Sequence, residues 1–276
     1  MEKIDKQTES AKPAQIVSSE RQILTLQQSL ELGLQHHTAG DLSKAEDIYQ
    51  QILQTDPNHP QVLHLLGVVS HQMGENERAT DLITKALAVK PDYVEAYSNL
   101  GLALQNLGRL EEAVTNYQKA IDIKPNYSEA HYNLGISFKE LGHLDEAVAS
   151  YLKTLTFKPD HAKAYNNLGL VLKSLGKPEE AIANYNKALA FKPNFAEAHN
   201  NLANEFKELG QLDEALAHYH KAIDIQPDYA EVYSNLGVAV QELGQLKEAV
   251  TYFQKAINIR PDYAEAHSNL GNSLQG

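Results

Sequence analysis

The pattern of apolar positions is helical along nearly the whole chain. Apolar residues recur at intervals of three and four, which places them on one face of an α-helix. Two consecutive faces of this kind are Tyr97, Leu100, Gly101 and Leu104, followed by Ala113, Tyr117 and Ala120. A short polar stretch containing glycine separates them. The pattern therefore predicts a pair of antiparallel helices, here called helix A and helix B.

Prolines and glycines show that this pair is repeated every 34 residues. The prolines are Pro57, Pro91, Pro125, Pro159, Pro193, Pro227 and Pro261. One glycine series is Gly33, Gly67, Gly101, Gly135, Gly169, Gly237 and Gly271, with Ala203 in its single gap. The other series is Gly40, Gly74, Gly108, Gly142, Gly176, Gly210 and Gly244. A fixed period of this length is the signature of a repeat protein.

Each series has a physical reason. The second glycine, as at Gly142, follows helix A, where a left-handed residue ends the helix without steric cost. The proline stops helix B because it lacks a backbone donor. The first glycine, as at Gly101, lies inside helix A at a cost of about 1 kcal/mol relative to alanine. Its recurrence predicts close approach of the two helices at that point.

Acidic and amide residues after each proline predict capped helices. The expected N-caps of helix A are Asp92, Asn126, Asp160, Asn194, Asp228 and Asp262. A glutamate follows three residues later at Glu95, Glu129, Glu197, Glu231 and Glu265, which would complete a capping box. A second role for this glutamate row, repelling acidic peptides or holding donors of a bound chain, is also open. Lys163 interrupts the row.

Three phrases resemble the core motif of the tetratricopeptide-repeat family: Ala96–Gly101, Glu112–Tyr117 and Lys119–Pro125. The resemblance implies an all-α fold, a right-handed superhelical solenoid of antiparallel helix pairs in which helix A lines a concave groove. We expect a disordered tail over residues 1–21 and a solenoid over 22–276. The solenoid would hold seven full repeats, about 26–263, and a truncated eighth, 264–276.

Helix A carries asparagine at one fixed position of the repeat. The row is Asn99, Asn133, Asn167, Asn201, Asn235 and Asn269. Asparagine inside a helix costs ~0.6 kcal/mol relative to alanine, so the row requires an explanation. One interpretation is that the asparagines cap or crosslink helices within the stack, or are inherited with the duplicated motif. The other is that they face the groove and bind the backbone of an extended peptide, since each amide offers donors and an acceptor.

A second resemblance favours peptide binding. The Asn-Leu-Gly and Asn-Leu-Ala motifs are similar to the repeat arm of the protein O-GlcNAc transferases, in which the row holds substrate polypeptide by its backbone. The resemblance implies that the six asparagines are peptide-binding residues. Glu31 and Leu65 stand at the corresponding positions of the first two repeats, so the track would run from Asn99 toward the C-terminus.

The histidines do not predict a metal site. His218 and His220 are two residues apart on a helix and therefore point in different directions. His131, His199 and His267 alternate with tyrosines at one position of helix A, which suggests duplication of a 68-residue unit. We expect these histidines to be half-buried packing residues.

Composition excludes several functions. A net charge of −12 disfavours nucleic-acid binding, and no apolar stretch is long enough to cross a membrane. The absence of cysteine rules out disulfides and thiolate sites. The first residues lack the apolar core of a signal peptide, which favours a cytoplasmic location. No catalytic or cofactor-binding motif occurs.

Two hypotheses follow for function. The first is a scaffold that binds proteins or extended peptides, with no catalysis and no cofactor. The second is the substrate-recruiting arm of a larger O-GlcNAc-transferase-like glycosyltransferase, or less plausibly of a sulfotransferase or methyltransferase. The final half-repeat, Ser268–Gly276, lacks a covering helix B, which suggests a fragment of a longer protein. The opening repeats resemble bacterial sequences. The sequence does not indicate an oligomeric state.

Overall fold

The computed structural model describes residues 25–274, which form fifteen α-helices and no β-strand. The odd-numbered helices are α1 (Leu26–Thr38), α3 (Pro60–Gln72), α5 (Val94–Asn106), α7 (Ser128–Glu140), α9 (Ala162–Ser174), α11 (Ala196–Glu208), α13 (Ala230–Glu242) and α15 (Ala264–Ser273). The even-numbered helices are α2 (Leu42–Thr55), α4 (Asn76–Val89), α6 (Leu110–Ile123), α8 (Leu144–Phe157), α10 (Pro178–Phe191), α12 (Leu212–Ile225) and α14 (Leu246–Ile259). The tail predicted for residues 1–21 lies outside the described residues.

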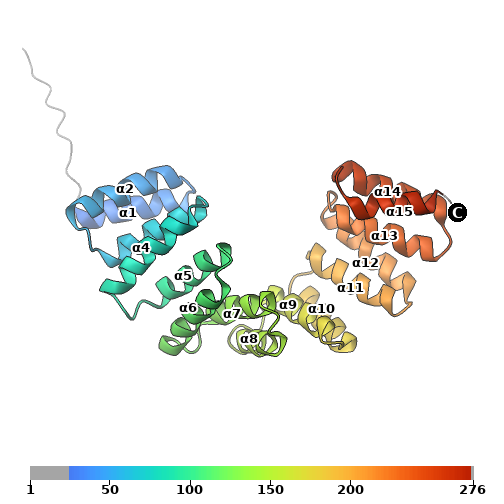
Figure 1. Cartoon of the computed structure of the whole chain (residues 1–276), viewed down its shortest axis with the longest axis horizontal. Coiled ribbons are helices and arrows are strands. Elements are labelled where there is room, and N and C mark those ends of the chain that lie inside the picture. Colours follow the sequence, from blue (N-terminus) through green and yellow to red (C-terminus); the bar gives the residue numbers. More distant parts are fainter. Residues whose placement is uncertain (1–24, 275–276) are drawn as a thin grey trace, which may run out of the picture.

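The helices form a superhelical solenoid, as the sequence predicts. Odd-numbered helices are helix A of each repeat, even-numbered helices are helix B, and each A packs against the B that follows it. Figure 1 shows an open arch in which α1–α5 and α11–α15 rise on either side of the middle helices. In the middle, α7 and α9 lie on the inner side of the arch, and α8 and α10 lie on the outer side.

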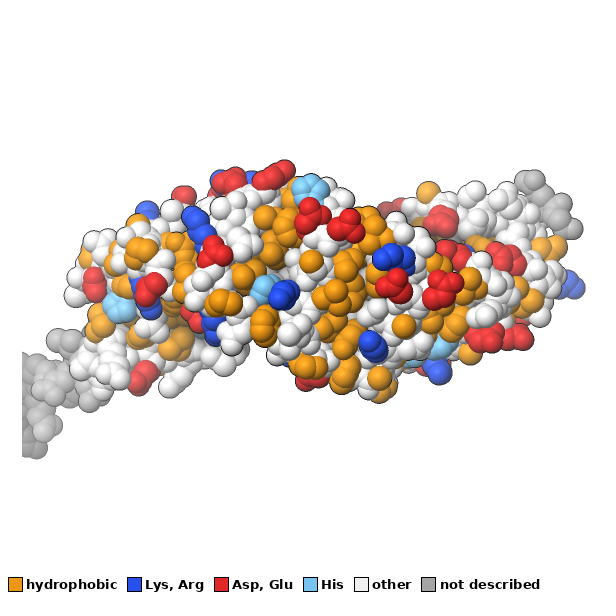
Figure 2. Space-filling view, turned by 90° about the horizontal axis from the view of Figure 1, so that it is seen from below, with side chains coloured by type: hydrophobic (Ala, Val, Ile, Leu, Met, Phe, Trp, Pro, Cys, Tyr) orange, Lys and Arg blue, Asp and Glu red, His pale blue; other side chains and the backbone are white. Residues whose placement is uncertain are grey.

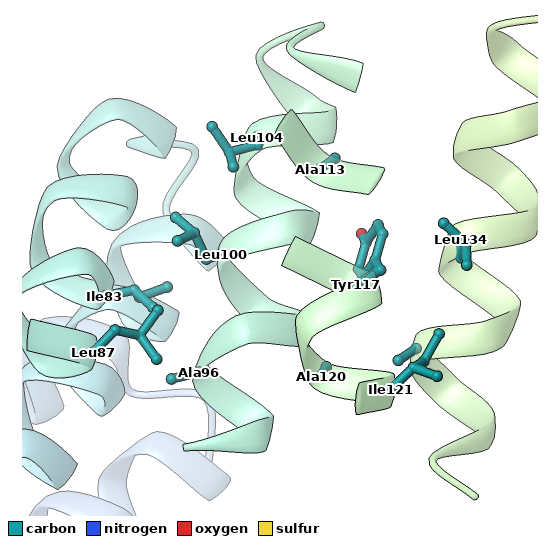
Figure 3. Packing of buried hydrophobic residues seen from close by; sticks show 11 residues of the cluster. Ile83, Leu87, Ala96, Leu100, Leu104, Ala113, Tyr117, Ala120, Ile121 and Leu134 are labelled. Atoms are coloured by element: carbon teal, nitrogen blue, oxygen red, sulfur yellow. The ribbon is translucent and has the colours of Figure 1, made fainter. Parts of the chain in front are cut away.

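The core runs continuously through the stack. Figure 3 shows side chains of α4, α5, α6 and α7 in one cluster, with the ring of Tyr117 between α5 and α7. Tyr117 is fully buried, and a Cβ added to Gly101 would lie 2.7 Å from its Cε1 atom. The same close contact recurs at Gly135 and Gly169 against Tyr151 and Tyr185. The prediction that this glycine marks close helix–helix approach is therefore confirmed.

The ends of the helices agree only in part with the predictions. All seven glycines of the second series have positive φ, for example +78° at Gly142, as expected for left-handed C-terminal residues. Helix B ends just before the proline, and in α6 the C-cap is Lys124.

The predicted capping boxes are wrong. Helix α5 begins at Val94 with Tyr93 as its N-cap, and no side chain caps it. Asp92 instead lies in a turn in which the N–H of Tyr93 donates to the carbonyl of Lys90 at 3.3 Å. Glu95 is then too close to the helix start to complete a box. The ring residue takes the N-cap, one position past the acidic residue. In the same way the residue after Asn126, Asp160, Asn194, Asp228 and Asp262 is the N-cap of its helix, and of these only His161 caps with its side chain.

The turn between α10 and α11 differs from the other inter-repeat turns. No backbone hydrogen bond joins Phe195 to Lys192 within the described residues, although the equivalent bond is present at Tyr93 and Tyr127. Phe195 is only 7 % exposed, whereas the residues at this position in the other repeats are half-buried. This turn borders a cavity, described below, that Pro193 and Asn194 help to line.

Candidate functional site: the inner face of helix A

The free face of helix A is defined by the residues that the core leaves uncovered. In α5 the core takes Ala96, Ser98, Leu100, Gly101, Ala103 and Leu104. Among the other positions, 95, 99, 102 and 106 have the spacing that places them together on the opposite side of the helix. We call this side, with its equivalents in the other repeats, the inner face.

The inner face lies on the concave side of the solenoid. Neighbouring odd-numbered helices contact one another from α3 to α9 and again from α11 to α15, whereas no even-numbered pair within residues 25–274 makes contacts of comparable extent. Odd-numbered helices are therefore closer together, as expected for the side with the smaller radius. Their arrangement in Figure 1, with α7 and α9 on the inner side, agrees with this.

The structure brings the six asparagines into one row along the inner face. Each of them is half-buried, so its amide is partly accessible. Four of them donate from Nδ2 to the preceding helix A, to the residue 35 positions earlier. We call these bonds rungs: Asn99 to His64 Nε2 (2.8 Å), Asn167 to the Tyr132 hydroxyl (3.2 Å), Asn201 to Asn166 Oδ1 (3.0 Å) and Asn235 to Asn200 Oδ1 (3.1 Å).

Two rungs are missing because the acceptor is too short. Asn133 and Asn269 face Ser98 and Ser234, and no hydrogen bond joins either pair within the described residues. The row therefore combines both interpretations of the sequence. Four amides link adjacent repeats, and every rung uses only one of the amide's two N–H groups and none of the acceptor capacity of its Oδ1.

Carboxylates flank the asparagines. The row that begins at Glu95 is exposed at the N-terminal ends of the odd-numbered helices. Glu197 lies beside the asparagine row, because its Oε1 accepts from Asn166 Nδ2 at 3.0 Å. A second exposed row at the other end of the helices consists of Glu140, Glu208 and Glu242.

The carboxylates of the first row help to raise the pKa of neighbouring tyrosines. Burial raises the pKa of Tyr229 to about 12, and the Glu231 and Glu197 carboxylates act in the same direction. Burial likewise raises the pKa of Tyr127 to about 12, with Glu129 the largest electrostatic contribution. The glutamates of adjacent repeats therefore act on a common region.

The histidines of helix A connect it to the preceding turn. Nε2 of His131, His199 and His267 lies 2.9, 3.1 and 2.9 Å from the carbonyl oxygens of Pro125, Pro193 and Pro261. His131 and His199 are more deeply buried than the expected half-burial, at 8 % and 6 % exposed, and His267 at the end of the stack is exposed.

A cavity on the helix B side holds a histidine pair that sequence reasoning did not find. It measures about 520 Å³ between α10 and α12. His199 and His218 meet there with their Nδ1 atoms 2.9 Å apart. Since His199 donates from Nε2 to Pro193, His218 Nδ1–H donates to His199 Nδ1. Burial lowers the pKa of His218 to about 4, with His199 and Lys221 acting in the same direction. The pair is therefore neutral and joins α11 to α12.

The outer side of the arch has a mixed surface. Figure 2 shows bands of hydrophobic side chains between scattered charges of both signs. Among the residues at the ends of helix B, Phe157 and Phe191 are 41 % and 51 % exposed. Within residues 25–274 no group of three or more potential metal ligands is found, and no helix there is long and apolar enough to cross a membrane.

Family profiles match most of the chain. The profile described as TPR repeat matches residues 106–142, 137–176, 203–244 and 241–276. Profiles described as tetratricopeptide repeat match residues 36–104, 94–115, 162–195 and 184–217. No curated protein matches the chain.

Solved structures with a similar fold include MamA, which is 30% identical with a TM-score of 0.55 over 59% of this chain and 95% of MamA. YrrB, described as a TPR protein with an unusual peptide-binding site, is 26% identical with a TM-score of 0.55 over 67% of this chain and 96% of YrrB. PilF of Pseudomonas aeruginosa shares the fold at 20% identity, with a TM-score of 0.69 over 77% of this chain and 97% of PilF. The chain belongs to the tetratricopeptide-repeat family.

Proposed function

We propose that the chain is a protein-interaction module that binds an extended peptide along the inner face of helix A. The observation that carries the proposal is the asparagine row. Each amide of the row is half-buried and keeps an unused Oδ1 acceptor together with at least one N–H donor. An extended peptide has unpaired N–H and C=O groups along its length, and this row offers them partners at regular intervals.

The similarity to YrrB supports the same function. YrrB carries a peptide-binding site and is covered almost completely by the match. Repeat solenoids bind through their concave surfaces, because the curvature of the stack exposes one continuous face. The acidic composition of the chain favours protein ligands over nucleic acid.

The missing rungs allow a test that separates binding from stability. In Asn133→Ala the amide is removed without breaking a rung, so we expect unchanged thermal unfolding and weaker peptide binding. In Asn201→Ala the rung to Asn166 is lost as well, so the free energy of unfolding should fall by about 1 kcal/mol. The ligands are peptides selected by the wild-type protein from a displayed library of random 15-residue sequences, and affinity is measured by fluorescence anisotropy.

The triple variant of Asn133, Asn167 and Asn201 to alanine should lose most binding of the selected peptides. Retention of wild-type affinity by this variant and by Asn133→Ala would overturn the proposal. In that case the row would serve only to join the repeats.

A second candidate function is the recruiting arm of an O-GlcNAc-transferase-like glycosyltransferase in a longer protein. The feature that favours it is the run of asparagines in Asn-Leu-Gly motifs toward Gly276. Sequencing the gene beyond the codon for Gly276 tests it. A glycosyltransferase-like region downstream would support the recruiting arm, and a stop codon after one further helix would exclude it.

A further inference from the structure

The chemistry of the inner face restricts the kind of peptide it accepts. Between the two carboxylate rows lies the asparagine row. One turn further along the helices follow the half-buried aliphatic side chains Leu102, Ile136, Leu170 and Val238, with Asn204 and Asn272 at this position on α11 and α15. The two carboxylate rows hold eight glutamates, and only Lys163 among their positions is a cation. Lys173, which adjoins the second row, is already paired with Glu205 and Glu208.

We propose that the occupant of the inner face is an extended basic peptide with lysine or arginine at about every third residue. This inference rests on the proposed function and specifies its ligand. The carboxylates accept the cations, the asparagines bind the backbone, and the aliphatic row contacts the intervening side chains. The face thus discriminates against acidic peptides by charge.

The expected spacing follows from the geometry of the stack. Packed helices lie about 8–10 Å apart, so successive glutamates of one row are separated by about this distance. An extended peptide advances about 3.3 Å per residue. One repeat therefore spans about three residues of ligand, and a cation at every third position meets one carboxylate per repeat.

The C-terminal half of the inner face offers the cations of such a peptide the longest uninterrupted carboxylate row, with Val238 as its aliphatic contact. Glu197, Glu231 and Glu265 occupy three successive repeats without interruption on α11, α13 and α15. These glutamates are exposed at the start of each helix, whereas Lys163 on α9 introduces a positive charge into the row. In the first two repeats, Gln27 and Gln61 stand at this position.

The test uses three labelled peptides of twelve residues: Lys-Val-Ser repeated four times, and the same sequence with glutamine or glutamate in place of lysine. Fluorescence anisotropy with the full chain should give an affinity for the lysine peptide at least ~10-fold higher than for the glutamate peptide, with glutamine between them. The difference should shrink as salt rises from about 50 mM to 500 mM, because the charges are exposed.

Two charge-matched variants locate the effect. The inner-face variant Glu197→Gln, Glu231→Gln, Glu265→Gln should bind the lysine peptide ~10-fold more weakly, since three exposed ion pairs are lost. The control variant Glu111→Gln, Glu179→Gln, Glu214→Gln changes net charge equally at the exposed starts of helix B and should change affinity by less than ~2-fold. Glutamine keeps an acceptor for Asn166, and circular dichroism confirms folding of both variants.

The outcomes separate this inference from the proposed function. Equal binding of all three peptides, or equal losses in the two variants, would overturn the basic-peptide inference and leave peptide binding in place. If the library-selected peptides bind the asparagine variants as tightly as the wild type, the proposed function itself is overturned. Preference for lysine that depends on Glu197, Glu231 and Glu265 would support both.

Discussion

At the scale of single residues, the hydrogen-bond partners of His64 determine which of its ring nitrogens carries the proton. It is 5 % exposed, and its Nε2 lies 2.8 Å from Asn99 Nδ2. An amide nitrogen can only donate, so Nε2 is the acceptor and Nδ1–H donates to the Tyr93 hydroxyl at 2.9 Å. Burial lowers the pKa of His64 to about 4, although the Glu95 carboxylate acts in the opposite direction. The fold therefore requires the neutral imidazole.

His64 should make the protein less stable in acid. The unfolded state has a histidine pKa near 6.5 and binds more protons than the folded state between that pH and about 4. The contribution of His64 is fully present above about pH 6.5 and is lost as the pH falls to 4, by about 3 kcal/mol. Urea unfolding of the wild type and of His64→Asn at pH 7 and pH 4 measures it.

The His64→Asn variant is a conservative control, because Asn166 and Asn200 occupy the same position and accept the same rung. We expect it to lose the His64 share of the acid sensitivity, while the share of His218, whose pKa is lowered equally, remains. The stability at pH 7 should be kept. An identical pH dependence in the two proteins would show that His64 is not responsible.

At the scale of the helices, α11 carries a buried charge at a core position. Glu205 is 1 % exposed and occupies the place held by Ala103 in α5 and Val171 in α9. Lys173 of α9 lies 2.8 Å from Glu205 Oε1 and 2.8 Å from Glu208 Oε1. The lysine therefore links α9 to α11 at the end opposite the Asn201 rung.

Lys173→Met should destabilise the protein by about 3–5 kcal/mol, because it leaves the Glu205 carboxylate buried without a partner. The double variant Lys173→Met, Glu205→Val should recover most of this loss, since valine fills the same position in α9. Free energies of unfolding from guanidinium titrations measure both. A double variant as unstable as Lys173→Met would contradict the buried-charge explanation.

The helices could be predicted from the sequence, whereas their side-chain partners could not. The 34-residue period predicts the helix pairs. It also predicts the role of Gly142, which depends on the backbone alone, and the close approach at Gly101, although not that the Tyr117 ring makes it. The capping boxes failed because Tyr93 takes the N-cap in place of Asp92. A rung at Asn201 but not at Asn133 depends on the length of a side chain in the preceding repeat, which only the stacked structure places.

The buried ion pair at Glu205 could have been predicted from the sequence. Most repeats carry alanine, serine or valine at this core position, so the glutamate there indicates a buried charge. Lys173 lies on helix A of the preceding repeat and is the cation that can reach it. The pairing of His199 with His218 left no comparable signal, since it depends on the cavity beside the open turn at Phe195.

At the scale of the whole molecule, each repeat contacts only its neighbours, so stability should vary along the stack. Helix α15 buries only Ala266 and Ser273, and α1 only Gly33. We expect the amides of α1 and α15 to exchange with deuterium faster than those of α7 to α12. Hydrogen-exchange mass spectrometry under native conditions measures this, and uniform exchange rates along the chain would indicate a single cooperative unit.

The distribution of rungs has a mechanical consequence. Three successive rungs, from Asn167, Asn201 and Asn235, join α7, α9, α11 and α13 into one braced segment. The junctions on either side of that segment, at Ser98 and Ser234, lack this brace. We expect stretching or bending of the solenoid to change the spacing of the inner face first at the two junctions without a rung, between α5 and α7 and between α13 and α15.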